Sequence, residues 1–259
     1  NLTRFMGLNS ISFIIAKGLS PAAGIKLMEN YGFNSALYST VVLAIIAVTL
    51  VFFLKDIRTE KEDDIDTNFI KVLLHRSVYL PTIILFCGMV TFGAISAMLP
   101  LFAEAKDITG IEYFFVINTI VVVATRIIVG RWSNQYLEQL VAVSLVFLTI
   151  SFISMSFVDN FAKLIIVAIV YGIGFALLFP LMTSLLVLHI RGVSRSMALG
   201  IYTSAFDLGV AGGVMLGGFS KYIDFKWLYL ILAVLPFSGF LIYQYVYRPF
   251  ISKNILEST

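Results

Sequence analysis

Charged residues are scarce in this sequence. Asp, Glu, Lys and Arg make up 13% of the 259 residues, hydrophobic residues make up 59%, and the mean hydropathy is +0.96. A soluble globular domain carries about 25% charged residues and covers its core with amphipathic elements. The composition therefore excludes an ordinary soluble domain. The net charge of +3 is small, and no cluster of basic residues alternates with aromatic ones, so we expect no nucleic-acid partner.

Residues for metal, redox and phosphate chemistry are scarce as well. Cys87 is the single cysteine, which excludes a disulfide within this chain, and His75 and His189 stand apart from each other. The sequence has no Gly-x-x-x-x-Gly-Lys-Ser/Thr loop for ATP, and it shows no pattern of nucleophile, base and orienting group. We therefore expect no metal, no cofactor and no enzymatic reaction.

Long apolar runs, in contrast, fill most of the chain. A helix needs roughly 20 mainly apolar residues to cross a hydrocarbon core of about 30 Å, and each run meets that length. The runs are too long and too uniformly apolar for the strands of a membrane barrel, so α-helices follow. We expect a polytopic all-α membrane bundle with these eight spans: Phe5–Met28, Ala36–Leu54, Val78–Phe102, Ile111–Gly130, Leu137–Phe157, Leu164–Leu188, Met197–Phe219 and Trp227–Tyr247.

The connecting segments alternate in positive charge, which predicts the orientation. If the N-terminus is cytoplasmic, Lys and Arg are more frequent in the cytoplasmic segments than on the opposite side. The cytoplasmic set is Arg4, Lys55, Arg58, Lys61, Lys71, Arg76, Arg131, Arg191, Arg195, Arg248 and Lys253, and the other set is Lys26, Lys106, Lys163, Lys221 and Lys226. We expect a plasma-membrane protein with both termini in the cytoplasm.

The spans are unevenly distributed along the chain. Residues 1–54 hold two spans, residues 55–77 form a charged linker, residues 78–247 hold six spans, and residues 248–259 form a tail. The acidic run at residues 60–66 is typical of a solvated linker. The apolar residues of segment 69–76 recur at helical spacing, which predicts a short helix along the membrane interface.

Small residues and prolines mark particular helices. Gly209, Gly213 and Gly217 recur every four residues and would let another helix backbone approach closely. Pro21 and Pro180 lie in the middle of their spans, where they remove backbone hydrogen bonds and permit bends. Such features suit helices that move against each other, and they equally suit static packing, because glycine and proline are common in membrane helices.

Three ionisable residues lie within the spans away from the outermost turns: Lys17, Arg126 and Asp207. A charge at the centre of a bilayer costs about 2.5 kcal/mol or more, so such residues normally face a partner or an aqueous cavity. Asp207 lies about 200° around its helix from Gly209, which predicts that it faces away from the glycine-packed neighbour and toward an aqueous route. The alternative is a carboxylate held in a structural pair.

Lys17 has the fourth span as its predicted neighbour, where Asn118 and Thr125 share one face. It would then bridge to that span or bind an anionic group of a substrate. The alternative is a lysine satisfied by backbone carbonyls and water. Arg126 lies near the cytoplasmic end of its span, so we expect its side chain to reach the interface as part of a gate.

Three stretches resemble the major facilitator superfamily, and most closely its drug-efflux branch. Residues 126–135 are similar to the cytoplasmic gating motif of the second half, with Gly130 and Arg131 present, but with Asn134 where the family has Asp. Residues 18–24, with Pro21 and Gly24, look like the antiporter signature. Residues 195–218, with Asp207, look like the penultimate helix of the efflux branch. The resemblance implies that the eight spans are helices five to twelve of twelve, and that four helices precede them.

The resemblance also implies the architecture and the function. Residues 1–54 would be the last two helices of the N-terminal half, and residues 78–247 the six-helix C-terminal half. The third and sixth spans would line a central cavity through Phe86, Thr91, Tyr171, Phe175 and Met182.

We expect a monomeric secondary transporter in the bilayer that exports small organic or amphipathic compounds by alternating access. Protons would drive the export, with Asp207 as the coupling residue. The alternatives are an uptake symporter for a sugar, organic acid or siderophore-like solute and, in another class, a membrane-embedded scaffold or enzyme without transport.

Overall fold

The computed structural model describes residues 24, 27–28, 30–53, 68–130, 136–190 and 192–251. Almost all of the first predicted span, most of the linker and the end of the tail lie outside these residues, as do Lys17, Pro21, Arg131 and Asn134. The described elements are α2 (Phe33–Val51), α3 (Phe69–Leu74), α4 (Arg76–Ala105), α5 (Glu112–Gly130), α6 (Leu137–Met155), α7 (Phe161–His189), α8 (Arg195–Gly217), η1 (Gly218–Lys221), α9 (Phe225–Ile242) and η2 (Tyr243–Tyr247).

Seven helices in the described residues are long and apolar enough to cross a membrane. They coincide with seven of the eight predicted spans, and the prediction of an all-α membrane bundle is confirmed. The last span runs from Phe225 through the π-helical turn η2 to Ile251. The two longest helices, α4 with 30 residues and α7 with 29, extend beyond their predicted bounds at both ends.

The chain forms two compact units, residues 1–63 and residues 64–259, which are described separately. The first unit contains α2, which starts after Gly32 in a left-handed conformation with φ of 81°. The second unit contains α3 to η2. The short helix α3 begins at the predicted amphipathic segment, buries Val72 and contacts α4 and α8.

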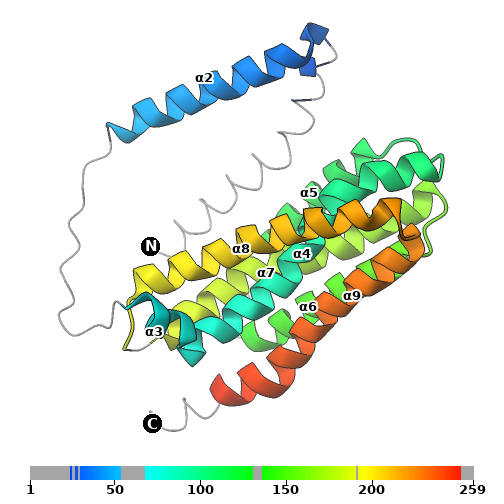
Figure 1. The fold of residues 1–259 in the computed structure, drawn as a ribbon. Coiled ribbons are helices and arrows are strands. Elements are labelled where there is room, and N and C mark those ends of the chain that lie inside the picture. Colours follow the sequence, from blue (N-terminus) through cyan, green and yellow to red (C-terminus); the bar gives the residue numbers. More distant parts are fainter. Residues whose placement is uncertain are drawn as a thin grey trace. The chain divides into compact units, whose positions relative to one another are not determined.

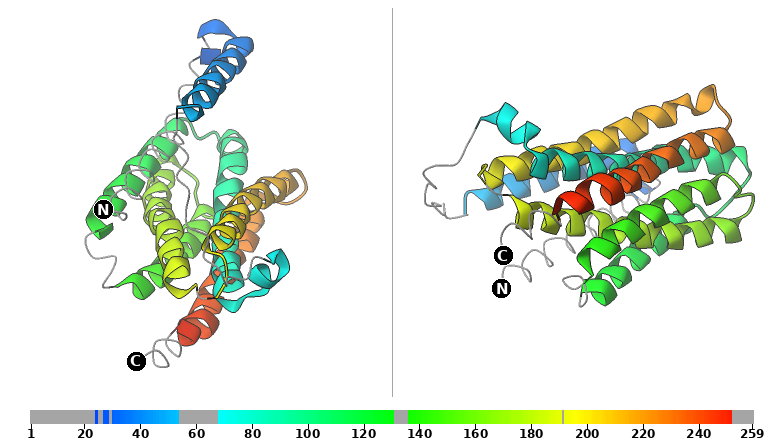
Figure 2. Two further views of the ribbon diagram at one scale, coloured as in Figure 1. Left: turned by 90° about the vertical axis from the view of Figure 1, so that its left-hand side faces the viewer. Right: turned by 90° about the horizontal axis from the view of Figure 1, so that it is seen from below.

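Helices of the second unit are arranged around α4 and α7, which contact each other at its centre (Figure 1, Figure 2). Helix α8 packs on α4, and α5 packs on α7, which gives the row α5–α7–α4–α8. Helices α6 and α9 contact each other and cover one side of this row, α6 against α7 and α9 against α4. Within the described part of this unit, no helix covers the opposite side. We call that opposite side the open face.

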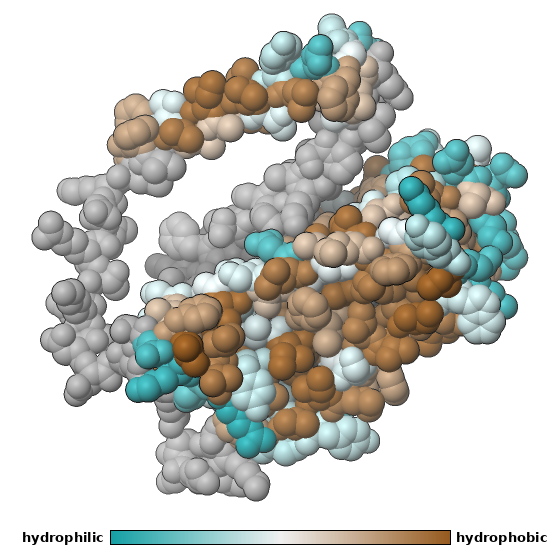
Figure 3. Space-filling model, in the orientation of Figure 1, coloured by the Kyte–Doolittle hydropathy of each residue, from teal (hydrophilic) through white to brown (hydrophobic). Residues whose placement is uncertain are grey.

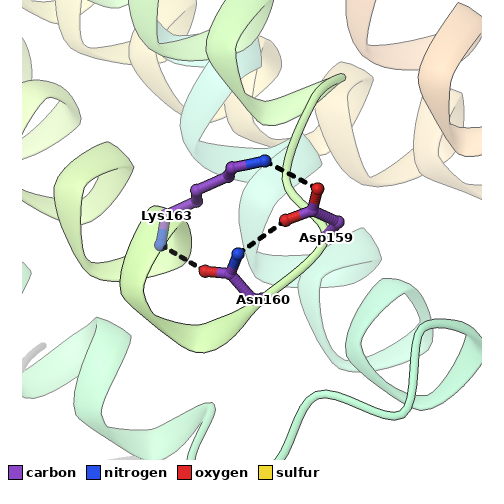
Figure 4. Close-up of polar contacts among 3 residues, drawn as sticks. All are labelled: Asp159, Asn160 and Lys163. Atoms are coloured by element: carbon purple, nitrogen blue, oxygen red, sulfur yellow. Dashed lines mark hydrogen bonds and ion pairs between the residues drawn. The ribbon is translucent and has the colours of Figure 1, made fainter.

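Polar groups gather at the ends of the bundle, whereas apolar side chains cover much of the length of its helices on the face shown in Figure 3. At the start of α7, the Asn160 side chain accepts a hydrogen bond from the Lys163 backbone N–H at 3.0 Å (Figure 4). Lys163 Nζ also donates to Asp159 at 2.6 Å, and this bond lowers the pKa of the Asp159 carboxyl group. These caps explain why α7 begins three residues before the predicted Leu164.

A second set of contacts joins α6 to the end of the last span. Tyr243 donates from its hydroxyl group to the Glu138 backbone carbonyl at 2.9 Å, and Arg248 Nε lies 3.2 Å from the Glu138 carboxylate. The Arg76 guanidinium lies over the Phe250 ring, 4.8 Å from its centroid. The starts of α4 and α6 and the end of the last span are thereby held together at one end of the bundle.

Candidate functional site

Helix α8 presents its glycines to α4. A Cβ atom on Gly209 would lie 2.9 Å from Met89 Cβ and 3.0 Å from the Phe86 carbonyl, and one on Gly217 would lie 3.0 Å from the Met98 side chain. A Cβ on Gly213 would overlap the Val90 carbonyl and the Ala94 amide. The two backbones are therefore in contact along the predicted glycine stripe, and a side chain there would force them apart.

Asp207 lies on another side of α8 and is exposed, as is Thr203. Asp207 precedes Gly213 by six residues, so its side chain points about 120° around the α8 axis from the side that contacts α4. On α4, Gly93 contacts the α8 backbone. Phe92 precedes Gly93 by one residue, so its side chain points about 100° around the α4 axis from that contact, in the opposite direction of rotation. Helices α4 and α8 are parallel. Rotations in opposite directions about their two axes therefore point both side chains to the same side of the α4–α8 contact. Asp207 therefore lies on the side where Phe92 meets α7, the open face.

The position of Asp207 along α8 is also informative. It follows Arg195, the first residue of the helix, by about 18 Å at 1.5 Å per residue, which is the middle of α8. Among the described residues it has no hydrogen-bond or ion-pair partner. A carboxylate facing lipid at this depth would cost about 2.5 kcal/mol or more, and this cost favours water or another part of the protein in front of the open face.

Arg126 of α5 bonds to the backbone of α7. Its Nε donates to the Ala176 carbonyl at 3.0 Å, and the side chain is half-buried. Ala176 precedes Pro180 by four residues, and Pro180 has no N–H to donate to that carbonyl. Arg126 therefore supplies the donor that proline removes from α7. Ala176 lies about 20 Å before the end of α7, so the side chain extends toward mid-helix and not, as expected, toward the cytoplasmic interface.

Arg126 also lies at the open face. Residue Asn118 faces α7, where its Oδ1 would lie 2.9 Å from a Cβ on Gly172, and Arg126 follows it by eight residues, or about 80°. On α7, Phe175 follows Gly172 by three residues, so its side chain points about 60° around the α7 axis from the α5 contact, in the opposite direction of rotation. Phe175 stacks on Phe92 of α4. Because α5 and α7 run in the same direction, Arg126 and Phe175 lie on the same side of their contact.

The two charges thus flank the open face from its two ends. Arg126 lies on α5, Asp207 lies on α8, and α7 and α4 lie between those helices. They form no ion pair with each other, and no carboxylate of the described residues pairs with Arg126. Phe92 and Phe175, with ring centroids 5.0 Å apart, provide an aromatic surface between them.

The predicted cavity-lining residues divide into two groups. Phe86 is 36% exposed and Phe175 is half-buried, so both reach the surface of the unit. Tyr171, Met182 and Thr91 are at most 1% exposed and pack inside it. Tyr171 stacks on Phe175 with centroids 5.8 Å apart. An aromatic stripe at helical spacing has the same sequence pattern whether it faces a cavity or a neighbouring helix, so the pattern alone could not separate these groups.

The remaining predicted residues have less structural definition. Asn118 Oδ1 is buried and has no partner among the described residues; Lys17, its predicted neighbour, lies outside them. Gly130 ends α5, and a Cβ atom there would meet nothing within 4 Å, as is also true at Gly24. Arg131 and Asn134, which follow Gly130 and are predicted to belong to the gate, lie outside the described residues.

The sequence did not predict the hydrogen bond between Arg126 and the Ala176 carbonyl. The only signal for it was Pro180, which identifies Ala176 as a carbonyl without a helical partner but does not identify the donor. A second contact of this kind is made by the Tyr202 hydroxyl group, which donates to the Phe179 carbonyl at 3.1 Å. Both contacts attach the middle of α7 to a neighbouring helix.

Comparison with known proteins identifies relatives of the chain. The family model described as Major Facilitator Superfamily matches residues 1–192 and, again, residues 109–257. The chain is also 28% identical over 223 residues to the staphylopine export protein of Staphylococcus aureus, an alignment that covers 78% of this chain and 55% of that protein. The chain therefore spans about half the length of this curated relative.

Proposed function

The chain belongs to the major facilitator superfamily, and we propose that it forms part of a proton-driven exporter of small organic compounds. The family consists of integral membrane transporters and not of enzymes, in line with the seven apolar helices. Export as the direction is supported by the function of the curated relative, an export protein, and by the resemblance of residues 18–24 to an antiporter signature.

The observation that carries the proposal is the position of Asp207. A carboxyl group at mid-helix, exposed on the open face and free of a described partner, has the properties that a proton carrier needs. Asp207 would bind a proton from one side of the membrane and release it to the other.

Alternating access would occur around the open face. The two halves of such transporters move against each other around a site near the bilayer midplane. In this chain, Phe175 would line the cavity, whereas the ring of Phe86 lies nearest Gly212, on the other side of the α4–α8 contact from Asp207. Lys17 and Asn118 would lie along the substrate pathway, and Pro21 with Pro180 would permit helix bending. Gly130, Arg131 and Asn134 would form the cytoplasmic gate, an assignment that rests on the sequence resemblance.

A transport experiment tests the proposal. Inside-out vesicles containing the full protein of which this chain is part are given a solute mixture and a pH gradient with an acidic vesicle lumen. The solutes that accumulate in the lumen are then measured. We expect accumulation that requires the gradient and disappears with Asp207→Asn. Asp107→Asn is the matched control, because it removes an exposed carboxyl group from a loop position with φ of 53° that asparagine tolerates. Undiminished accumulation by the Asp207→Asn variant would remove Asp207 from the mechanism.

A further inference from the structure

We propose that Arg126 binds an anionic group, such as a carboxylate, of the transported solute. The proposal rests on the transport function above and adds to it the charge of the solute. It starts from the geometry of one hydrogen bond, from Arg126 Nε to the Ala176 carbonyl at 3.0 Å.

That hydrogen bond fixes the guanidinium but uses little of its donor capacity. A guanidinium group has five N–H donors in a planar fork, and the Nε–H is one of them. Ala176 is the hydrogen-bond partner that the described residues provide for Arg126, so the four donors on the terminal nitrogens remain available. Arg126 is half-buried, so part of its side chain reaches the surface of the unit.

The carbonyl left by Pro180 does not by itself require a charge. A hydroxyl or amide side chain at position 126 could donate one hydrogen bond to Ala176, without the cost of placing a cation among apolar helices. The described carboxylates leave this cation without an ion pair, and Asp207 lies on the far flank of the row. An anion supplied from outside these residues would neutralise this cation.

The surroundings of Arg126 fit a solute with an anionic end and an apolar body. The guanidinium presents a fork that matches a carboxylate in a bidentate manner. The stacked rings of Phe92 and Phe175 lie on the same side of the α5–α7 contact and offer an apolar surface next to it. A phospholipid headgroup has similar chemistry, and the experiment below separates it from a solute.

The test identifies the solutes before it measures affinity. Inside-out vesicles with the full protein receive a small-molecule extract of the cells and a pH gradient, and accumulated solutes are identified by mass spectrometry. We expect that every solute whose accumulation requires Asp207 carries an anionic group at neutral pH. For such a solute, Arg126→Gln should raise the half-saturating concentration at least about tenfold with the maximal rate within about twofold, the loss expected for one charge-assisted fork.

Two comparisons make the result specific. Arg126→Lys keeps the charge but not the fork and should raise the half-saturating concentration less than Arg126→Gln does. If Arg126→Gln does not fold, as judged by size-exclusion chromatography, the Lys variant against wild type carries the test. The methyl ester or amide of the same solute should be transported equally by wild type and variant, because the anionic group is gone.

Several outcomes would overturn the proposal and leave transport standing. One is that the accumulated solutes are only neutral or cationic, and another is that Arg126→Gln leaves the half-saturating concentration unchanged. A third is that wild-type transport is lost in phosphatidylcholine vesicles and restored by an anionic lipid, and that Arg126→Gln abolishes this response to the lipid. The failure of transport itself has a different signature: no gradient-dependent accumulation by wild type, or accumulation that Asp207→Asn leaves intact.

Discussion

The role of Arg126 as a backbone donor can be tested independently of transport, by restoring the hydrogen bond that Pro180 removes. Pro180→Ala returns an N–H group to the position from which α-helical geometry directs it to the Ala176 carbonyl. In wild type, Arg126→Leu leaves that carbonyl without a donor, and a buried polar group without a partner costs about 1–3 kcal/mol. In the Pro180→Ala background this cost should vanish.

The informative quantity is therefore the coupling between the two substitutions. Arg126→Leu alone also removes a poorly solvated charge, so the sign of its single effect is not decisive. We expect Arg126→Leu to be less destabilising in the Pro180→Ala background than in wild type, by about 1–3 kcal/mol in the free energy of unfolding. The assay is equilibrium unfolding of the purified full protein in detergent, followed by circular dichroism.

Pro236 provides the matched control for this cycle. It also lies inside a membrane-spanning helix, α9, and is buried, but its helix does not pack on α5. Arg126→Leu and Pro236→Ala should therefore be additive within about 0.5 kcal/mol. The reasoning is refuted if Arg126→Leu and Pro180→Ala are additive within the same margin, because Arg126 would then not replace the donor that proline lacks.

Two further predictions concern packing and pH. Gly213→Ala places a methyl group against the backbone of α4 and should lower the free energy of unfolding by about 1–3 kcal/mol. Gly200→Ala, in the same helix with nothing within 4 Å of the added Cβ, should be neutral or stabilising by up to about 1 kcal/mol. Equal unfolding midpoints for the two variants would contradict the contact between α8 and α4. Lys163 lowers the folded-state pKa of Asp159, so this pair stabilises the protein above the unfolded-state pKa of about 4 and loses its contribution as pH falls through the folded value. Wild type and Asp159→Asn should therefore differ at neutral pH and converge in acid, and a difference that is constant down to pH of about 2 would exclude the linkage.

Hydropathy predicted the membrane-spanning helices well, because a bilayer imposes both their length and their apolar composition. The ends were less accurate. Helix α7 starts at Phe161, three residues before the predicted span, because Asn160 and Asp159 form a polar cap that hydropathy does not register. Helix α4 likewise continues to Ala105, past the predicted Phe102.

Within the candidate site, the sequence was informative where periodicity determines direction. The spacing of Gly209, Gly213 and Gly217 places them on one side of α8 and Asp207 on another, whatever the neighbours are. The partner of Arg126 depends on a contact between residues 50 positions apart, and the partner is a backbone atom, which no residue type reveals. Tyr171 and Phe175 lie on the same stripe, yet burial distinguishes them because it depends on how α4 and α7 pack.

Cysteine labelling can establish whether the Asp207 side of α8 faces water, as proposed above, or lipid. Asp207→Cys and Val234→Cys are each introduced into the full protein with Cys87 replaced by alanine; Val234 is 59% exposed on α9, away from the open face. We expect a membrane-impermeant thiol reagent to modify the cysteine at 207 in intact vesicles, from at least one side of the membrane, and to leave the one at 234 unmodified. A cysteine at 207 that stays as unreactive as that at 234 would contradict the proposal.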